Sequence, residues 1–304
     1  MSLLKKYWFK YTDKKKYYAL KAFKEKLKKE KKLAKYNKHY SNIIDTILQK
    51  INDKDQINFK HSGHLGDIVY ALPVIKELSK SHTCNLYIHS DKPMPGYYMH
   101  PSGNVILSKK IILMFIPLLQ KQDYLNKVDI WNEEEIDIDL DIFRDIPLDF
   151  SFLSQRWYFH IAGVQTDLNQ RFIDVPEHEH IKNKVVIVRS FRARNYFINY
   201  NFLEKYDNLL FIGIREEYED LKKSVKNLEF YDVKDFYEMA QIIKSSKFFL
   251  GNQSFAYSLA ESLKVPRLLE GNPDFSVVFP VGDNAYDFFF QQHFELYFDK
   301  LFNA

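Results

Sequence analysis

One aspartate in this sequence stands where acid–base chemistry is favoured. Residues 59–78 read FKHSGHLGDIVYALPVIKEL: an apolar strand, a polar loop with two glycines, and a helix that begins near Asp67. The N-terminus of a helix stabilises an ionised carboxylate, and an ionised carboxylate can accept a proton from a reacting hydroxyl group. Asp67 is therefore a candidate general base, and by itself it is equally typical of an ordinary helix N-cap.

A second segment has the features of a diphosphate-binding site. Residues 247–270 read KFFLGNQSFAYSLAESLKVPRLLE, in which an apolar strand ends near Gly251 and a helix follows at once. Backbone N–H groups at the start of a helix bind phosphate groups. The candidate residues for such a ligand are Asn252, Gln253 and Ser254, with Glu270 at the end of the next strand.

Three arginines follow the first strand of the second half of the chain. They lie in residues 188–195 (VRSFRARN), between the two segments above. Arginine binds phosphate oxygens through two parallel hydrogen bonds, so Arg189, Arg192 and Arg194 are candidates to neutralise a diphosphate. The alternative is a solvated basic loop that binds no ligand.

These motifs resemble those of glycosyltransferase family 9, the ADP-heptose:lipopolysaccharide heptosyltransferases. Residues 66–73 (GDIVYALP) are similar to the family's Gly-Asp, five residues and Pro, which follow its first core strand. Residues 247–266 are similar to the second-domain signature, strand–Gly-Asn-Asp-Ser-Gly-x-x-His-x-Ala–helix–Val-Pro. Gln253, Phe255 and Ser258 replace the Asp, the second Gly and the His of that signature. The donor implied is therefore a nucleotide sugar, and not ADP-heptose in particular.

The resemblance implies a role for each candidate residue. Asp67 is implied to be the catalytic base that faces the acceptor hydroxyl. The family's phosphate-contacting loop adds Ser190 to the donor-binding candidates, and its carboxylate near the ribose is matched by Glu216 in residues 213–217 (GIREE). The acceptor side is implied to include Ser62, Gly63, His64 and Gly66.

The implied reaction is an inverting, metal-independent sugar transfer to a glycan, lipid-linked or protein acceptor. No cofactor is expected, because the nucleotide sugar is itself a substrate, and no metal site is expected either. The replaced signature positions favour an alternative from a different class. The same fold could be a non-catalytic nucleotide- or sugar-binding module, or a scaffold tethered by its basic N-terminal arm.

The elements that must position these residues alternate along the chain. Strands are expected at 57–61, 83–89, 184–189, 208–214, 228–231, 247–250 and 267–270, with helices in the second half near 201–206 and at 216–224, 234–245 and 254–264. This alternation predicts an α/β architecture of two Rossmann-like domains whose parallel sheets face a cleft, the GT-B arrangement. The predicted boundaries are a basic helical arm at 1–55, an N-terminal acceptor domain at 56–180 and a C-terminal nucleotide-sugar domain at 181–304.

Residues 136–143 alternate acidic and apolar side chains, and this pattern predicts a half-exposed strand. They contain two Asp-x-Asp motifs, which bind a metal–nucleotide complex in the other main glycosyltransferase fold. On an alternating strand Asp137, Asp139 and Asp141 share one face. We expect that face to point to solvent.

Positive charge is concentrated at the N-terminus. Residues 1–38 hold 15 Lys against three carboxylates, a net charge of +12, and since the whole chain carries +4 the remainder sums to −8. Apolar residues at helical spacing within 14–36 predict a basic amphipathic helix. It is either a solvated helix that caps the first domain or a segment attracted to an anionic membrane leaflet or to nucleic acid. The nearby Trp8, Phe9 and Tyr11 keep the membrane alternative open. Nucleic-acid binding is not expected of the acidic domain pair.

The composition of the chain argues against several classes of protein. Hydrophobic residues make up 46% of the chain, which favours a packed globule over a disordered chain. Cys84 is the only cysteine, so no internal disulfide and no cysteine-based zinc site can form. The longest apolar run, 111–119, is about half of what a bilayer span needs, and the lysine-rich N-terminus lacks the apolar core of a signal peptide. These features predict a cytoplasmic protein. If the arm contacts a membrane, we expect a peripheral contact at the inner membrane face.

Overall fold

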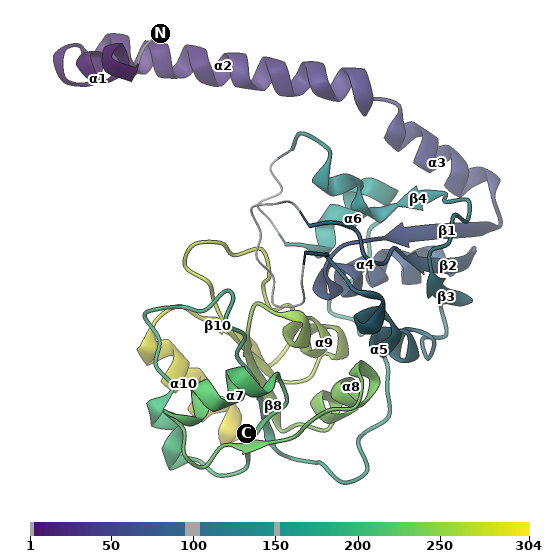
Figure 1. Cartoon of the computed structure of the whole chain (residues 1–304), viewed down its shortest axis with the longest axis vertical. Helices are drawn as coiled ribbons and strands as arrows, with labels where there is room; N and C mark the ends of the chain where they lie inside the picture. The colour runs from purple at the N-terminus through teal and green to yellow at the C-terminus, as the bar shows by residue number, and fades with distance from the viewer. Residues whose placement is uncertain (1–2, 95–103, 149–152) are drawn as a thin grey trace.

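The computed structural model describes residues 3–94, 104–148 and 153–304, with side chains from Trp8 onward. Met1 and Ser2 of the predicted arm lie outside the described residues. Two parallel β-sheets divide the body into an N-terminal half and a C-terminal half, which lie beside one another in Figure 1. The predicted α/β class with two parallel sheets is confirmed.

The sheet of the N-terminal half has four parallel strands in the order β3-β2-β1-β4. The strands are β1 (Gln56–His61), β2 (Thr83–Ile88), β3 (Lys127–Ile130) and β4 (Ile138–Asp139). The helices of this half are α3 (Ile43–Asp53), α4 (Leu65–Leu78), α5 (Lys109–Leu119), α6 (Gln155–Ala162) and the short 3-10 helix η1 (Leu140–Arg144). Five of the six residues of β2 are buried, as expected for a parallel sheet covered on both faces.

The sheet of the C-terminal half has six parallel strands in the order β10-β9-β8-β5-β6-β7. The strands are β5 (Val185–Val188), β6 (Leu209–Phe211), β7 (Glu229–Phe230), β8 (Phe248–Asn252), β9 (Arg267–Glu270) and β10 (Ala285–Phe288). The helices are η2 (Asn201–Lys205), α7 (Arg215–Lys222), α8 (Phe236–Lys244), α9 (Phe255–Leu263) and α10 (Gln291–Phe302). The strands and helices predicted here are present within a few residues, except that the helix near 201–206 is a 3-10 helix. The last strand and helix were not predicted.

Alternate side chains of β5 enter two different cores. Val185 and Ile187 belong to a core within the C-terminal half, together with apolar residues of α10. Val186 and Val188 belong to a core that both halves share. This shared core forms where α4 packs against α9 and α5 packs against α8. The two helices that carry the predicted motifs, α4 and α9, are therefore fixed against each other.

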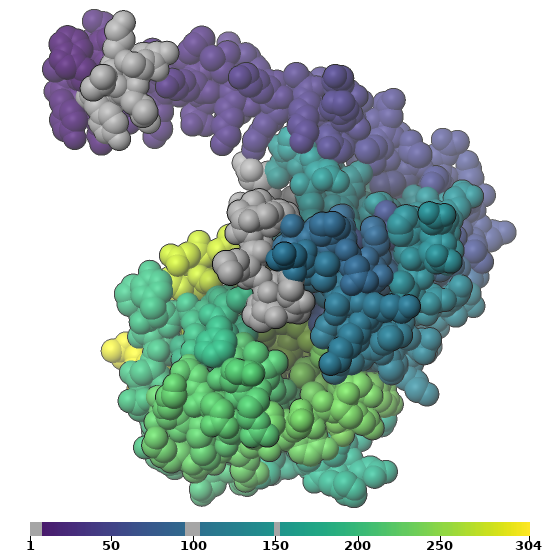
Figure 2. All heavy atoms as spheres, viewed as in Figure 1, coloured from purple at the N-terminus to yellow at the C-terminus, as the bar shows by residue number. Residues whose placement is uncertain are grey.

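The basic arm consists of α1 (Leu3–Thr12) and α2 (Lys14–His39), and it projects from the body in Figures 1 and 2. The predicted helix is confirmed, but α2 buries none of its residues. The interpretation of α2 as a cap on the first domain is therefore wrong. That position is taken by α3, which places Ile47 in the shared core beside α6. No helix in the described ranges is both long and apolar enough to span a bilayer.

The half-exposed strand expected over 136–143 is wrong beyond Asp139. The carboxylate of Asp139 accepts the backbone N–H of Asp141 at 3.0 Å, and this turn begins η1. The side chains of Asp137 and Asp141 consequently point inward, and these residues are only 7% and 4% exposed. The solvent-facing interpretation of the Asp-x-Asp pattern is therefore wrong for both.

Candidate functional site

The loop after β1 leads into α4, and Asp67 lies in the first turn of that helix. α4 begins at Leu65 with His64 in the N-cap position, so Asp67 is its third residue. The backbone N–H of Asp67 donates to the carbonyl of His64 at 2.9 Å. The interpretation of Asp67 as an ordinary N-cap is wrong, and its carboxylate has a different partner.

That partner is Arg144, the last residue of η1. Its Nη2 atom lies 2.5 Å from Oδ2 of Asp67, and its Nη1 atom contacts Oδ1 of Asp141. The side chains of Arg144 and Asp67 are 29% and 23% exposed, so the pair lies at the boundary between core and surface. The guanidinium of Arg144 thus forms ion pairs with two carboxylates, those of Asp67 and Asp141.

Asp141 is the buried end of this network. Its Oδ2 atom accepts the backbone N–H of Ser62 at 2.8 Å and also accepts the Ser62 hydroxyl. Lys92 donates to the Ser62 hydroxyl at 3.0 Å and lies 3.9 Å from Asp141. Burial by itself raises the pKa of Asp141, but His61, Arg144 and the Ser62 hydroxyl more than offset it, so the pKa is lowered. Asp141 is therefore ionised at neutral pH.

His61, the last residue of β1, packs behind this network with its ring fully buried. Nδ1 accepts the backbone N–H of Gly63 at 2.9 Å, and Nε2 lies 3.0 Å from the hydroxyl of Tyr158. Because Nδ1 accepts, the ring proton sits on Nε2, which donates it to Tyr158. Burial lowers the pKa of His61 to about 4, so the ring is neutral at physiological pH. The ring therefore holds the loop after β1 through its hydrogen bond with Gly63 and adds no charge to it.

Gly63 leaves the space that the guanidinium of Arg144 occupies. A Cβ atom at this position would overlap the guanidinium, which two carboxylates hold in place. The position requires glycine because of this close approach. Of the predicted acceptor-side residues, Ser62 and Gly63 thus lie against the Asp141–Arg144 pair.

The start of α4 lies against the start of α9. A Cβ atom on Gly66 would lie 3.8 Å from Oγ of Ser258 and 4.0 Å from Cα of Phe255. The Phe255 ring packs edge-on against Phe115 of α5 and Phe236 of α8, with ring centroids 5.5 and 4.7 Å apart. The two predicted motifs, far apart in the sequence, are brought together by this contact.

Polar side chains at the start of α9 bind backbone groups of the protein. Ser254 is the N-cap, and its Oγ atom accepts the N–H of Tyr257 at 3.4 Å. Gln253 accepts the N–H of Val277 at 3.5 Å, and Ser258 donates its hydroxyl to a carbonyl within α9 at 2.6 Å. Within the described part of the chain, the first two N–H groups of α9 have no protein acceptor. Such groups are the ones that bind anions at helix N-termini.

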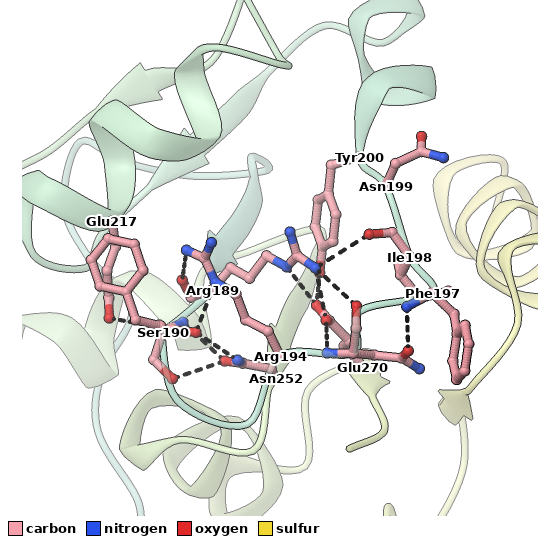
Figure 3. A network of polar contacts seen from close by, with 12 residues as sticks. Arg189, Ser190, Arg194, Phe197, Ile198, Asn199, Tyr200, Glu217, Asn252 and Glu270 are labelled. Carbon is pink, nitrogen blue, oxygen red and sulfur yellow. Dashed lines mark hydrogen bonds and ion pairs between the residues drawn. The ribbon is translucent and has the colours of Figure 1, made fainter. Parts of the chain in front are cut away.

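In the C-terminal half, Arg189 and Glu270 form an ion pair beneath the loop that follows β5 (Figure 3). Nε and Nη2 of Arg189 donate to the two carboxylate oxygens at 2.8 and 2.9 Å. Glu270 is fully buried and also accepts the N–H of Asn195 at 2.6 Å and the hydroxyl of Tyr200 at 2.7 Å. The Arg189 guanidinium stacks on the Tyr200 ring, 4.3 Å from its centroid. These contacts join the ends of β5 and β9.

Asn252, at the end of β8, holds the same loop from the other side. It is fully buried; its Oδ1 atom accepts the N–H of Ser190 at 3.0 Å, and its Nδ2 atom donates to the carbonyls of Ser190 and Arg192, both at 2.8 Å. Glu217 of α7 accepts the N–H of Phe191 at 2.9 Å. Burial raises the pKa of Glu217. Figure 3 shows Asn252, Glu217 and Glu270 converging on this loop.

The remaining donor-binding candidates differ in their surroundings. Arg194 pairs with Asp220 at 2.6 Å. Arg192 is exposed, and its guanidinium makes no ion pair or hydrogen bond with the residues that the structure describes. Glu216 is exposed in the first turn of α7, whereas its neighbour Glu217 faces the loop. Arg192 is thus the arginine of this loop whose charge stays available to a ligand.

Sequence reasoning missed several residues of the N-terminal network, among them Asp141, Arg144 and Tyr158. Asp141 belongs to the Asp-x-Asp pattern, but its alternation with apolar residues conceals the point where the strand ends. A usable signal was Arg144, three residues after Asp141, which is the spacing of a local ion pair. Tyr158 carries no sequence signal, because only the packing of α6 brings it to His61.

Comparisons with known proteins relate this chain to others by fold. No protein-family model matches the sequence, and no curated protein matches it. The structure of E. coli heptosyltransferase WaaC with ADP aligns with a TM-score of 0.55 at 8% identity, covering 81% of this chain and 99% of that one. A family 9 glycosyl transferase from Veillonella parvula aligns at 0.49 with 11% identity, covering 83% and 90%. The dodecameric iron-containing glycosyltransferase TibC from enterotoxigenic E. coli aligns at 0.47 with 16% identity, covering 71% and 58%.

The likeness to WaaC shows that this chain has a heptosyltransferase-like fold. The fold expected from the order of the motifs is therefore confirmed. At 8% identity this likeness concerns the fold, and the activity has to be argued from the site itself.

Proposed function

We propose that this chain is an inverting, metal-independent glycosyltransferase. It moves a sugar from a nucleotide-sugar donor to a hydroxyl group of a glycan, lipid-linked or protein acceptor. Asp67 takes the proton of that hydroxyl as its oxygen bonds to the anomeric carbon. The bond between the anomeric carbon and the diphosphate breaks, and its electron pair leaves with the diphosphate.

One observation carries this proposal: two helix N-termini, from different halves of the molecule, lie against each other. The first turn of α4 holds the Asp67 carboxylate, and the start of α9 has two N–H groups without a protein acceptor in the described ranges. The close approach of Gly66 to Ser258 joins them. A donor bound here would have a base on one side of its anomeric carbon and anion-binding backbone on the other.

The leaving diphosphate is stabilised by α9 and by the loop after β5. Ser254 and the first N–H groups of α9 bind it, and Arg192 supplies the positive charge that is not already paired. Asn252, Arg189 and Glu270 hold the loop in place through hydrogen bonds to its backbone. A preorganised contact of this kind is worth about 3 kcal/mol of barrier.

The substitution Asp67→Asn tests the proposed chemistry. Asparagine keeps the shape but cannot accept the proton, so kcat should fall at least about a hundredfold while the protein stays folded. Turnover is measured as nucleoside diphosphate released and sugar transferred, over a panel of nucleotide sugars and acceptors. Glu77→Gln is the control, because Glu77 lies on the same helix in an ion pair with Lys80 at 2.7 Å. Equal turnover of Asp67→Asn and wild type would remove Asp67 from the mechanism.

Metal independence is part of the proposal and has its own test. No group of three His, Cys, Asp or Glu side chains among the described residues is placed to hold a metal ion. Dialysis against EDTA should leave kcat within about twofold of the untreated value, because α9 and Arg192 stabilise the leaving group without a cation. Loss of turnover that added divalent metal restores would contradict this part.

A second candidate function is a non-catalytic nucleotide- or sugar-binding module. The observation that favours it is that Arg189 and Arg194 already pair with Glu270 and Asp220, which leaves fewer charges for a diphosphate. Thermal shift against nucleoside diphosphates and sugars, followed by a donor-hydrolysis assay, separates the two functions. Stabilisation by a nucleotide without turnover of any donor would favour the module.

We also infer that the arm holds the protein against an anionic membrane from the cytoplasmic side. No residue of α2 is buried, and Leu20, Phe23 and Leu27 share one side of the helix among its lysines. Trp8 and Tyr11 of α1 are 63% and 78% exposed. Lysines attract anionic headgroups, and exposed aromatic and aliphatic side chains enter the interface, so the arm suits such a surface.

A further inference from the structure

We propose that Arg144 and Asp141 are positioning residues that orient the catalytic carboxylate of Asp67. They hold its Oδ2 atom and turn Oδ1 toward the acceptor hydroxyl. This inference rests on the proposed function of Asp67 and adds to the active site a segment, η1, that no motif identifies.

The two oxygens of Asp67 have different surroundings. Oδ2 lies 2.5 Å from Nη2 of Arg144, and Oδ1 has no hydrogen bond to any residue that the structure describes. A general base needs one lone pair aimed at the proton it takes and a fixed orientation of the rest of the group. Asp67 meets both conditions, because one oxygen is anchored and the other is left for a ligand.

The guanidinium that anchors Asp67 is itself held on three sides. Its Nη1 atom contacts Asp141, and one edge lies over Gly63, where a Cβ would overlap it. Its Cζ atom lies 4.4 Å from the centroid of the Phe143 ring. That ring in turn packs against Trp157 of α6, with centroids 4.8 Å apart. Arg144 is therefore a fixed point and not a flexible surface cation.

Asp141 connects this fixed point to the sheet. Its carboxylate accepts both the backbone N–H and the hydroxyl of Ser62, the residue that follows β1. A chain of contacts thus runs from the end of β1 through Asp141 and Arg144 to the first turn of α4.

Asp137 provides a matched comparison for Asp141 within the same segment. It too is buried, and it accepts the N–H of Asn58, four residues before Ser62, at 2.9 Å. It pairs with Lys54 at 2.6 Å as Asp141 pairs with Arg144. The two aspartates share burial, a backbone hydrogen bond and a cation, but only the cation beside Asp141 reaches Asp67.

The experiment compares Asp141→Asn and Asp137→Asn in the full chain. Both should lower the melting temperature by similar amounts, because both remove a buried charge from a similar pair. Only Asp141→Asn should lower kcat, by about tenfold or more, with the KM of the donor within about twofold, since positioning acts on the transition state. Arg144→Gln should behave like Asp141→Asn, and Arg144→Lys, which keeps the charge, should retain more of kcat.

A uniform loss of kcat in all these variants, or equal kcat in Asp141→Asn and Asp137→Asn, would overturn the positioning role. If the wild-type protein turns over no donor, the proposed function fails, and crystal structures of Arg144→Lys and Arg144→Gln then decide the positioning claim. An Asp67 side chain that keeps its orientation only in Arg144→Lys supports the claim. The same orientation in both variants contradicts it.

Discussion

At the scale of single residues, His61 couples the candidate site to pH. Its ring is fully buried, and burial lowers its pKa to about 4, whereas in the unfolded chain it has the ordinary value of 6.5. Between these two values the unfolded state binds more protons than the folded state. The free energy of unfolding therefore falls as the pH drops from 6.5 toward 4, and this contribution is complete above pH 6.5.

Replacing His61 tests this coupling. Wild type should lose about 2–3 kcal/mol more stability than His61→Gln between pH 8 and pH 4.5, because the pKa of His61 is lower in the folded than in the unfolded state. Urea unfolding at both pH values measures the difference. His180→Gln is the control, since its side chain is 85% exposed. The same pH dependence in wild type and His61→Gln would show that this ring is not the titrating group.

The residues of the site were predictable to different extents. Asp67 was predicted from its place after a strand and a glycine-bearing loop, and the structure places it in the first turn of a helix, as expected. Arg144, which contacts Asp67, and Asp141, which contacts Arg144, were not predicted, because their positions depend on how the chain turns after β4. The alternation of polar and apolar residues predicts which face of a strand a side chain occupies only as far as the strand continues.

At the scale of elements, Glu270 links three segments that no short motif connects. It ends β9 and accepts hydrogen bonds from Arg189 at the end of β5 and from Asn195 and Tyr200 in the following loop. A buried charge with this many donors is stable only while its counter-charge remains. The shape of the proposed phosphate-binding loop therefore depends on the Glu270 carboxylate.

Glu270→Gln should destabilise the protein by about 3–5 kcal/mol, because Arg189 then stays buried without a counter-charge. It should also weaken nucleotide binding measured by calorimetry at a temperature where the variant is still folded. Glu229→Gln is the comparison, because Glu229 pairs with Lys184 at 2.7 Å but its side chain is 57% exposed, and that change should cost under about 1 kcal/mol. Equal losses in the two variants would mean that burial of the Glu270 pair does not matter.

Elements of the C-terminal half could be predicted more fully than those of the N-terminal half. The strand β5 is apolar throughout, β8 begins with three apolar residues and β9 has two at its centre, and the helices between them have clear periodicity. By contrast, β4 pairs over only two residues, and a side-chain hydrogen bond of Asp139 ends it. The sequence pattern there suits a strand, and a local capping interaction overrides it.

At the scale of the whole molecule, one apolar cluster runs through both halves, and the arm stays outside it. The contacts of α4 with α9 and of α5 with α8 build that cluster. The sequence could not predict this packing. The apolar residues of each helix suit packing against the sheet of its own half, and nothing in the sequence shows which of them pack against a helix of the other half. The arm was predicted as a helix, but its separation from the body follows only from the structure.

The arm should bind vesicles according to their charge. The protein should sediment with vesicles containing phosphatidylglycerol and not with pure phosphatidylcholine, and binding should weaken steeply as salt rises. Replacing Lys21, Lys24, Lys28 and Lys31 by Gln should reduce binding without changing the melting temperature, because α2 buries nothing. Replacing Leu20, Phe23 and Leu27 by Ser removes apolar side chains and keeps the lysines. This variant therefore separates insertion of side chains into the bilayer from attraction of the lysines to its charge. Sedimentation that is independent of both lipid charge and these lysines would contradict the membrane role.

The length of α2 has a further consequence. Its 26 residues form a rod of about 39 Å that meets the body at one end only. A rod that lies flat on a bilayer keeps the site within reach of headgroups, whereas one that stands upright lifts the site by several nanometres. The tilt of this one helix would therefore set the height above the bilayer at which the proposed glycosyltransferase meets its acceptor.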